Sequence, residues 1–311
     1  MKVSLITAVK DEATTARRLI RSIRDQSRQP DEWLVVDGWS NDGTAEVFER
    51  EPNCRVIREA GNIAYARNLA VSEAAGEVIA VIDGGCAADP DWLSRLVEPL
   101  EHGQADIAAG VTVPEIFRPF DIAQWVLLDQ FQVAAFAARQ PALSSRSVAF
   151  LKTAWERCRY PEWLDHSEDA WLFEQWRHLG LKILRVPEAA VHWTLRASVG
   201  QWFEQHFRYM RGQGRAGLFC RRHSARFLFY GAVAALLLAS FRVPWAALVG
   251  VGAWVSYCGL SLVRFPVAVR GSSAMSKVKT LAWLPVMLLT MDVAKSAGYL
   301  SGQLERMASR R

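Results

Sequence analysis

The sequence predicts an α/β protein with a mostly parallel, doubly wound sheet, followed by a C-terminal region of apolar helices. Three observations lead to this prediction. Short β-rich runs alternate with helical patterns over about the first hundred residues, and such alternation is typical of parallel sheets. Two of these runs end in an aspartate, at Asp37 and Asp83. The last part of the chain is apolar and basic, which sets it apart from the sheet region.

Four runs rich in β-branched and other apolar residues are predicted strands. They are Val3–Ala8, Trp33–Asp37, Arg55–Arg58 and Val78–Asp83. The helices predicted after them are Glu12–Gln26, a short helix after Gly43, Ile63–Ala75 with Asn62 as its N-cap, and a helix that begins near Pro90. Ligands of open α/β sheets bind beyond the carboxyl ends of the strands, so we expect Asp37 and Asp83 to lie at a binding edge.

The charges divide the chain into an acidic front and a basic rear. The whole sequence holds 37 Lys and Arg and 32 Asp and Glu, a net charge of +5. From Gln205 onward there are fifteen basic residues and two acids, Asp292 and Glu305. The front therefore carries a net charge of −8. This asymmetry indicates two regions with different tasks.

Two apolar runs predict a membrane hairpin over residues 227–263. Phe227–Phe241 is apolar or small throughout, and Val243–Val263 is uncharged for 21 residues. The second run is long enough to cross about 30 Å of hydrocarbon, and a buried core helix pair is the alternative. An amphipathic segment at 278–300 contains Pro285. We interpret it as re-entrant or interfacial, or as part of a longer helix that reaches Tyr299.

Basic residues flank both apolar runs. They are Arg208, Arg211, Arg215, Arg221, Arg222 and Arg226 before the first run, and Arg264, Arg270, Lys277 and Lys279 after the second. The positive-inside rule places both flanks in the cytoplasm, and the same charges favour anionic lipid over nucleic acid. The N-terminus lacks the apolar stretch of a signal peptide, and the five cysteines form no C-x-x-C pair. We therefore expect a bacterial inner membrane protein whose front domain is cytoplasmic.

Four segments of the front resemble family-2 glycosyltransferases of GT-A fold. The first predicted turn, Ala8–Glu12, lacks the G-x-G-x-x-G of a dinucleotide-binding fold, and no P-loop is present. The resembling segments, in the family's order, are KVSLITAVKDE, WLVVDGWSNDGT, GNIAYARNLAVSEAAGEVIAVIDGG and WLDHSEDAWLFEQWRHLG. The resemblance implies inverting transfer from a nucleoside-diphosphate sugar to a lipid-linked or saccharide acceptor near the membrane. It also implies a catalytic domain over 1–222, with an interfacial helix at about 198–215 and a membrane-attachment region over 223–311.

On this resemblance, Glu12, Asp37 and Arg67 contact the donor nucleotide. Glu12 and Asp37 match the acids that contact base and ribose, with a weak preference for uridine. The alternative for Asp37 is turn formation, because Asp-Gly and Asn-Asp-Gly sequences follow it. Arg67 matches an arginine near the ribose and diphosphate, and the alternative is a solvated arginine on a helix face.

The resemblance also implies a divalent cation, Mg²⁺ or Mn²⁺, beside the diphosphate. Asp83 occupies the place of the first acid in the family's D-x-D motif, and Gly85 stands where the second acid is expected. His192 is similar in position to a histidine that completes the metal shell in some relatives. The alternative for His192 is a core or surface histidine. Asp89 and Asp91 follow Asp83 closely in sequence, but they fall at a predicted helix start, where capping explains them equally well.

Ser167-Glu168-Asp169 resembles the family's E-D signature at a helix start. Inversion requires a base on the face of the sugar opposite the leaving group. We assign Asp169 as that base, with Glu168 orienting it or the acceptor. Helix capping is again the alternative, because acids are favoured in a first helical turn.

The segment Gln201–Gly212 carries aromatic and basic residues at helical spacing. We interpret it first as an interfacial amphipathic helix and second as a source of Arg208 or Arg211 for the diphosphate. Two other functions remain open. A non-catalytic membrane scaffold on a degenerate GT-A domain is favoured by Gly85, and a nucleotidyltransferase is disfavoured because its glycine-rich loop is absent.

Overall fold

The computed structural model describes residues 1–137, 143–262 and 265–309. It divides into two compact units. The first, an α/β unit, comprises Met1–Glu115 and Ala135–Thr194, and the second, a helical unit, comprises Ile116–Ala134 and Leu195–Arg311. The predicted domain boundary was at residue 222, whereas this division assigns residues 195–222 to the helical unit.

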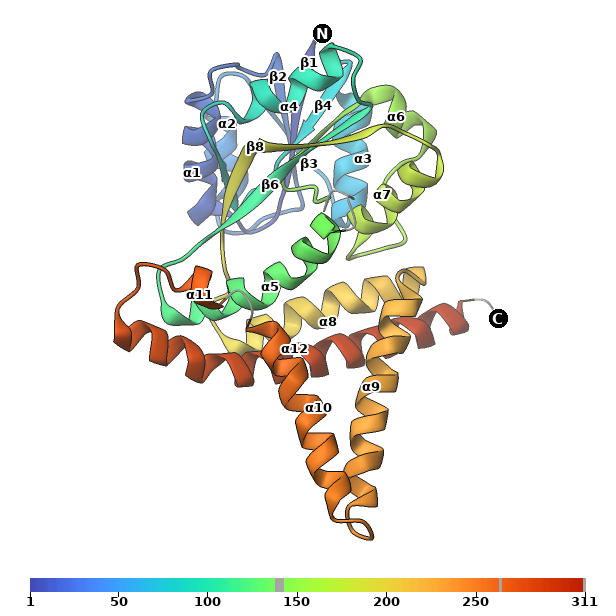
Figure 1. Cartoon of the computed structure of the whole chain (residues 1–311). Coiled ribbons are helices and arrows are strands. Elements are labelled where there is room, and N and C mark those ends of the chain that lie inside the picture. The colour runs from blue at the N-terminus through green and yellow to red at the C-terminus, as the bar shows by residue number, and fades with distance from the viewer. Residues whose placement is uncertain (138–142, 263–264, 310–311) are drawn as a thin grey trace. The chain divides into compact units, whose positions relative to one another are not determined.

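The α/β unit is built on one sheet (Figure 1). Its strands are β1 Val3–Val9, β2 Glu32–Asp37, β3 Cys54–Arg58, β4 Val78–Val81, β5 Cys86–Ala88, β6 Ile107–Glu115, β7 Val148–Leu151 and β8 Ile183–Thr194. Their order in the sheet is β3-β2-β1-β4-β7-β6-β8-β5. The four strands predicted from sequence are adjacent in this order.

The sheet is mixed, with four parallel and three antiparallel pairings among the described strands, which agrees with the prediction of a mostly parallel sheet. The neighbours β3, β2, β1 and β4 pair in parallel, as do β6 and β8. In contrast, β7 is antiparallel to both β4 and β6, and β5 is antiparallel to β8. The strands that follow Pro90 were not predicted, because their pairing depends on contacts between distant segments. The result is consistent with the GT-A fold.

Six helices accompany these strands in the described part of the α/β unit. They are α1 Ala13–Arg24, α2 Thr44–Glu49, α3 Ile63–Glu73, α4 Trp92–Glu101, α6 Lys152–Arg157 and α7 Glu168–His178. The predicted N-cap of α3 is confirmed, since the Asn62 side chain accepts a hydrogen bond of 3.0 Å from the Tyr65 N–H. The core on one side of the sheet is closed by large side chains such as Phe150 and Trp176.

The helical unit contains most of α5 Pro119–Ala137, together with α8 Val199–Ala216, α9 Cys220–Ala239, α10 Trp245–Ser261, α11 Phe265–Ala268 and α12 Ala274–Ala308. Its core includes Trp202, whose indole N–H donates to the Met287 carbonyl over 3.2 Å. α12 continues through Pro285 as one helix of 35 residues. Of the alternatives for this segment, the longer helix is the one observed.

Glycines let α8 and α12 pack backbone against backbone. A β-carbon at Gly298 would lie 2.3 Å from the Phe207 carbonyl oxygen, and one at Gly302 would lie 2.0 Å from the Arg211 carbonyl oxygen. Gly298 and Gly302 are four residues apart and therefore lie on one face of α12. Small residues at this spacing allow two helices to approach closely.

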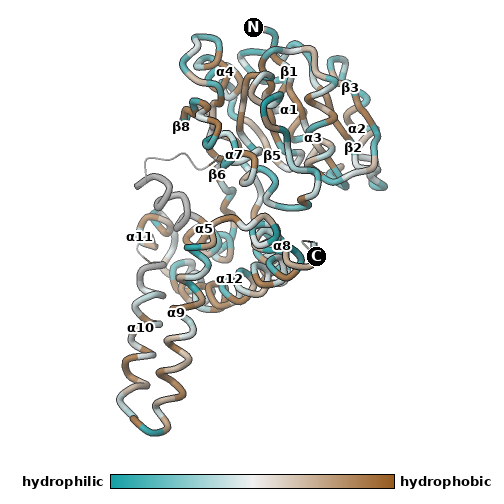
Figure 2. Tube along the Cα trace, turned by 90° about the vertical axis from the view of Figure 1, so that its right-hand side faces the viewer, coloured by the Kyte–Doolittle hydropathy of each residue, from teal (hydrophilic) through white to brown (hydrophobic). Residues whose placement is uncertain are grey.

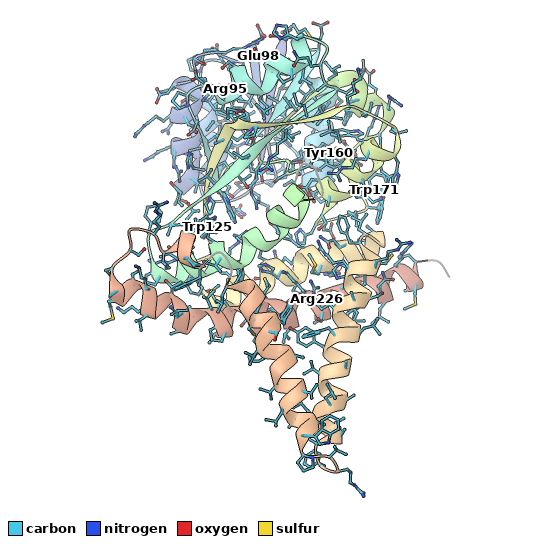
Figure 3. All side chains as sticks on the ribbon, viewed as in Figure 1. Arg95, Glu98, Trp125, Tyr160, Trp171 and Arg226 are labelled. Carbon is cyan, nitrogen blue, oxygen red and sulfur yellow. The ribbon has the colours of Figure 1, made fainter. Side chains whose placement is uncertain are left out.

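A buried aspartate attaches the α9–α10 hairpin to α12. Asp292 accepts hydrogen bonds from the hydroxyls of Tyr230 on α9 and Tyr257 on α10, the latter at 3.0 Å. Arg226 of α9, labelled in Figure 3, places its Nε 3.9 Å from the same carboxylate. Buried polar groups need such partners, so this cluster specifies how the three helices pack.

The two predicted apolar runs form a helical hairpin, coloured mainly as apolar in Figure 2. Within the described ranges, no helix combines the length and the apolar composition that a membrane crossing requires. α10 ends at Ser261 after 17 residues, or about 26 Å, and α9 begins with arginines in its first turns. The transmembrane prediction is thus not supported by these helices. Val263 and Arg264, which belong to the predicted hairpin and its flank, lie outside the described residues.

The glycine contact gives a test of the helical unit. Gly302→Ala should destabilise the protein by about 1–3 kcal/mol, because its methyl group collides with backbone that cannot move aside. Gly231→Ala in α9 is the matched control, since no atom of the described structure lies within 4 Å of its β-carbon position. There, alanine should be neutral or stabilising by up to about 1 kcal/mol. Thermal unfolding of the full chain, followed by circular dichroism, measures both. Equal melting temperatures for Gly302→Ala and wild type would contradict the proposed packing.

Candidate active site

Arg67 of α3 is the centre of a buried ion-pair network. Its side chain is 3% exposed; one terminal nitrogen donates to Asp83 over 2.7 Å, and the other donates to Glu168. The guanidinium carbon lies 5.4 Å from the ring centre of Tyr160, which Figure 3 labels. Arg67 therefore joins the end of β4 to the start of α7. It is not the solvated arginine of the alternative interpretation, and its burial separates it from open solvent.

Burial changes the protonation of this network. Burial, followed by the charge of the neighbouring Asp169, raises the pKa of the Glu168 carboxyl to about 7, against the opposing effect of Arg67. Burial alone would lower the pKa of Arg67, but the Asp83 and Glu168 carboxylates outweigh it and the pKa is raised. Glu168 can thus gain or lose a proton near neutral pH while Arg67 stays charged.

Asp169 is half-buried in the first turn of α7. Its carboxylate accepts a 3.3 Å hydrogen bond from the Ser145 N–H and a 2.7 Å bond from the Ala170 N–H. The Ser145 hydroxyl lies 3.1 Å from the hydroxyl of buried Tyr160. Helix-end hydrogen bonding therefore contributes to the position of Asp169. Its partial exposure also leaves it reachable, unlike Glu168.

Arg146 is a site residue that the sequence interpretation missed. In the antiparallel pairing of β4 with β7, Val81 faces Val148. Two residues beyond each, Asp83 and Arg146 face one another, with Arg146 Nε 3.7 Å from Asp83 Oδ2. The Arg146 guanidinium lies 4.5 Å from the ring centre of Trp193 on β8. Only the unpredicted β7 pairing could have revealed this contact.

Strained backbone gathers at the loops that carry the predicted residues. Three non-glycine residues have left-handed backbone there: Asp11 after β1 (φ 54°), Trp39 after β2 (φ 58°) and Ser167 before α7 (φ 61°). A bulky residue in this region is rare and costs energy. Trp39 is also 58% exposed. Backbone strain of this kind is often found at functional sites, so this edge is a candidate site.

The carboxylate of Asp37 is hydrogen-bonded within the turn that follows β2. It accepts hydrogen bonds from the Ser40 N–H and hydroxyl, and the residue is fully buried. This geometry fits the turn-forming alternative, and contact with a nucleotide stays a prediction. Glu12 lies closer to the loop after β4, because its carboxylate oxygens are 3.7 and 3.8 Å from the position of a β-carbon on Gly85.

His192 pairs with Asp89 rather than with Asp83. The imidazole Nε2 is 2.8 Å from Asp89 Oδ1, across the pairing of β5 with β8. In the described part of the chain, no three His, Cys, Asp or Glu side chains converge as a metal site would require. The predicted pair of metal ligands, Asp83 and His192, is therefore held by separate partners.

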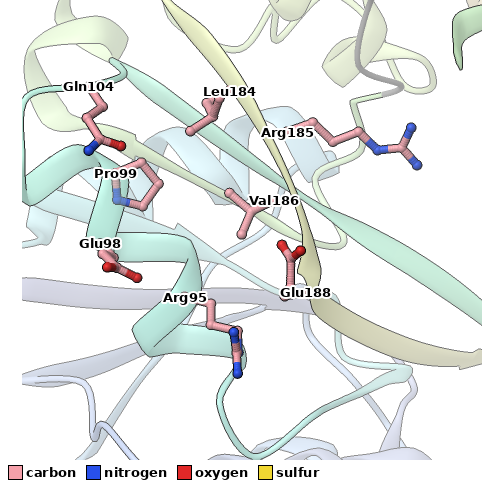
Figure 4. Close-up of a pocket in the computed structure, with 8 residues that line it drawn as sticks. All are labelled: Arg95, Glu98, Pro99, Gln104, Leu184, Arg185, Val186 and Glu188. Carbon is pink, nitrogen blue, oxygen red and sulfur yellow. The ribbon is translucent and has the colours of Figure 1, made fainter.

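Neither Arg211 nor a surface pocket of the α/β unit shares a residue with this network. Arg211, on α8 of the helical unit, pairs with Glu305 over 2.6 Å. A pocket of about 260 Å³ lies between α4 and β8 (Figure 4). It is lined by Arg95, Glu98, Pro99, Gln104, Leu184, Arg185, Val186 and Glu188. None of the predicted site residues lines it.

Part of the chain matches a known protein family. Residues 4–131, which include β1 to β6 and the Asp83 loop, match the family described as glycosyl transferase family 2. The matched region is less than half of the chain. The match ends before α7, so the assignments of Glu168 and Asp169 still stand on the resemblance and on their geometry.

Curated relatives of the chain include two glycosyltransferases and a succinoglycan biosynthesis protein. Glycosyltransferase AglE of Haloferax volcanii is 30% identical over 117 residues, covering 35% of this chain and 38% of the relative. A glucosyl-dolichyl phosphate glucuronosyltransferase of the same organism is 28% identical over 124 residues, covering 36% and 38%. The succinoglycan biosynthesis protein ExoO of Rhizobium meliloti is 28% identical over 165 residues, covering 50% and 47%. The chain thus spans less than half the length of these relatives.

A solved structure supports the fold. The mannosyltransferase PcManGT of Pyrobaculum calidifontis, in complex with GDP-mannose and Mn²⁺, superimposes with a TM-score of 0.61. The match covers 100% of this chain and 88% of PcManGT, at 17% identity. At this identity the likeness shows the fold alone.

The raised pKa of Glu168 predicts a pH-dependent stability. As pH rises from the usual 4.5 towards about 7, the unfolded state loses the Glu168 proton while the folded state keeps it. The free energy of unfolding should therefore fall through this window and stay lower above it. Glu168→Gln should lose that component, whereas Glu174→Gln on the same helix should keep it. Urea unfolding at about pH 5 and about pH 8 tests this. If the free energy of unfolding of Glu168→Gln changes between these two pH values as much as that of wild type, the prediction is wrong.

Proposed function

We propose that this protein is an inverting glycosyltransferase that moves a sugar from a nucleoside-diphosphate sugar to an acceptor at a membrane surface. The observation that carries the proposal is the Asp83–Arg67–Glu168 network. It connects the loop after β4, within the matched family 2 domain, to the acids at the start of α7. Both kinds of group that transfer requires, one for the donor and one for the acceptor, then belong to a single rigid arrangement.

Asp169 is the base in this proposal. Its carboxylate takes the proton of the acceptor hydroxyl while that oxygen attacks the anomeric carbon. The bond from that carbon to the diphosphate oxygen breaks on the opposite face, and the nucleoside diphosphate leaves with the electron pair. The Ser145 N–H and the helix start hold the carboxylate in place. Glu168, bound to Arg67, positions the first turn of α7.

The donor side depends on charge near the diphosphate. The neighbour PcManGT was solved with Mn²⁺, and a bound cation of this kind neutralises diphosphate charge. In this chain Asp83 and His192 would be its predicted ligands. They do not fit that role as they stand, since each is held by another side chain. The proposed mechanism therefore contains no step that depends on a metal ion. Contacts of Arg211 and Glu12 with the donor stay predictions.

The exposed face of α12 supports attachment to a membrane surface. Its large exposed side chains recur at spacings of three, four, seven and eight residues: Val278, Val286, Leu289, Val293, Leu300 and Leu304. Between Lys279 and Glu305 the exposed and half-exposed residues carry no charge. This stripe is about 40 Å long, and Lys277, Lys279 and Arg306 at its ends suit anionic headgroups. The helix would lie in the interface rather than cross it.

A cytoplasmic, membrane-proximal site fits a lipid-linked or growing saccharide acceptor. One relative carries the name glucosyl-dolichyl phosphate glucuronosyltransferase, and another is a succinoglycan biosynthesis protein. The competing possibility, a non-catalytic scaffold, is favoured by the replacement of an acid with Gly85. Slow hydrolysis of a nucleotide-sugar by the pure protein separates the two. Failure to bind or hydrolyse any donor in a panel of nucleotide-sugars would support the scaffold.

Asp169→Asn tests the base. It should lower kcat by roughly 10²–10⁴ and leave donor affinity nearly unchanged, because the proton acceptor is lost but the donor contacts remain. Donor affinity is measured by calorimetry and turnover by release of nucleoside diphosphate. Glu174→Gln, farther along α7, is the control and should keep wild-type turnover. Near-normal turnover in Asp169→Asn would remove this residue from the role.

Charges placed on the α12 stripe test membrane attachment. The double variant Val293→Glu, Leu300→Glu should reduce co-sedimentation with anionic phosphatidylglycerol vesicles by about tenfold or more, because both side chains would otherwise enter the lipid interface. Leu184→Glu, which changes an exposed apolar residue of the α/β unit, is the control. Equal vesicle binding by wild type and the double variant would exclude this face of α12.

A further inference from the structure

A second pocket of the α/β unit, of about 340 Å³, lies between α1 and the end of α2. Its charged lining consists of four arginines, Arg17, Arg21, Arg24 and Arg50, and one acid, Glu51. Four positive charges and one negative charge leave the lining with a net charge of +3. This excess is unusual for its surroundings, because the front of the chain carries a net charge of −8.

The arginines of α1 share one face of that helix. Arg17, Arg21 and Arg24 follow the i, i+4, i+7 spacing, and α1 contains no acid. Like charges one turn apart repel each other and destabilise a helix. The helix dipole favours cations in the last turn, which holds Arg21 and Arg24. Helix stability alone therefore does not account for Arg17.

The acids beside the pocket are already paired. Glu51 accepts hydrogen bonds from Arg24 Nε at 2.8 Å and from Arg24 Nη2 at 2.7 Å, and its side chain is 11% exposed. Glu46 and Glu49 of α2 both pair with Arg58 of β3. Within the described ranges, the other three arginines of the pocket form no ion pair. Their charges are thus not neutralised by the protein itself.

The lining of the pocket fits a compact anion with more than one charge. Ile20 is 5% exposed and Val47 is half-buried, so apolar side chains lie between the cationic ones. Arg17, Arg21 and Arg50 are exposed. A planar guanidinium presents paired donors that match the oxygens of phosphate. Three such groups in so small a volume are balanced better by phosphate groups than by a single carboxylate.

The pocket is separate from the candidate active site. α1 and α2 contact each other beside the sheet (Figure 1), and each follows a strand of its parallel part. Both helices therefore run back from the carboxyl edge of the sheet, where Asp37 and Asp83 lie. The pocket is lined by the middle and end of α1 and by the end of α2. It shares no residue with the Asp83–Arg67–Glu168 network.

We infer that this pocket binds a phosphate-bearing ligand with at least two negative charges, outside the site proposed for the donor. Arg17, Arg21 and Arg50 donate to the phosphate oxygens, and the Arg24–Glu51 pair holds α1 to the segment after α2. A free phosphorylated molecule and the headgroup of an anionic lipid both offer this chemistry. The inference does not rest on the proposed function, because only residues of the pocket carry it.

Calorimetric titration of the full chain with inorganic diphosphate at low ionic strength tests the inference. Wild type should bind it saturably, and the affinity should fall as salt screens the exposed charges. The double variant Arg17→Gln, Arg21→Gln should bind about ten- to a hundredfold more weakly, because charge-assisted hydrogen bonds are lost. Arg17→Lys, Arg21→Lys keeps the charges and should retain part of the affinity. Arg95→Gln, which changes an exposed arginine of the pocket beside α4, is the matched control and should bind as wild type does.

Amide hydrogen exchange locates the bound diphosphate. It should slow exchange over residues 17–24 and 47–51 in wild type, but not in Arg17→Gln, Arg21→Gln. Slower exchange confined to the loops after β1, β2 and β4 would place the diphosphate at the donor site and overturn the inference. Undiminished affinity in a double variant that melts at the wild-type temperature would also overturn it.

Co-sedimentation with vesicles separates the two sources of phosphate. The variant Val293→Glu, Leu300→Glu serves as the background, because it lacks the apolar stripe of α12. If the ligand is a headgroup, this background should bind phosphatidylcholine vesicles that contain phosphatidic acid, and adding Arg17→Gln and Arg21→Gln should abolish that binding. If the ligand is a free molecule, the added changes should affect diphosphate binding alone. Wild type that binds no diphosphate, together with vesicle binding that the arginine changes leave unaltered, would exclude both sources and with them the inference.

Discussion

The buried guanidinium of Arg67 is the constraint on which the rest of the site depends. A charge removed from water must be paired, and removing one partner of such a pair is far more costly than the pair is stabilising. Asp83 and Glu168 supply the pairing from the end of β4 and the start of α7. The position of α7, and with it Asp169, therefore follows from an electrostatic requirement inside the α/β unit.

The same constraint limits what the Arg67 side chain can bind. Because Arg67 is committed to two carboxylates, it cannot also serve a ligand without leaving a buried acid unpaired. Arg146 lies at the margin of the network, where its guanidinium packs on the ring of Trp193 and its Nε is 3.7 Å from Asp83. The sequence resemblance pointed to Arg67 as a donor contact; the structure buries it between Asp83 and Glu168, and contact with the donor stays a prediction.

Local signals were predicted well from sequence, and long-range pairing was not. The strands β1 to β4 and the Asn62 cap follow from alternation, β-branched composition and capping chemistry within a few residues. The strand β7 contains only Val148–Leu151, and nothing near it in sequence shows that it pairs antiparallel with β4. Arg146 was missed for that reason. In the helical unit, hydropathy located the hairpin but not the early end of α10 at Ser261, since the end of a helix depends on its tertiary contacts.

The packing of α12 has a consequence for how the protein behaves when no lipid is present. The inner face of α12 contacts α8 through glycines, so the two helix backbones pack directly against each other with few side chains between them. The outer face cannot rotate inward to hide its valines and leucines, because Gly298 and Gly302 fix the rotation of the helix. In aqueous buffer such a face lowers its free energy by meeting another of its kind. The two glycines on the opposite side of α12 therefore determine which apolar side chains a detergent has to cover during purification.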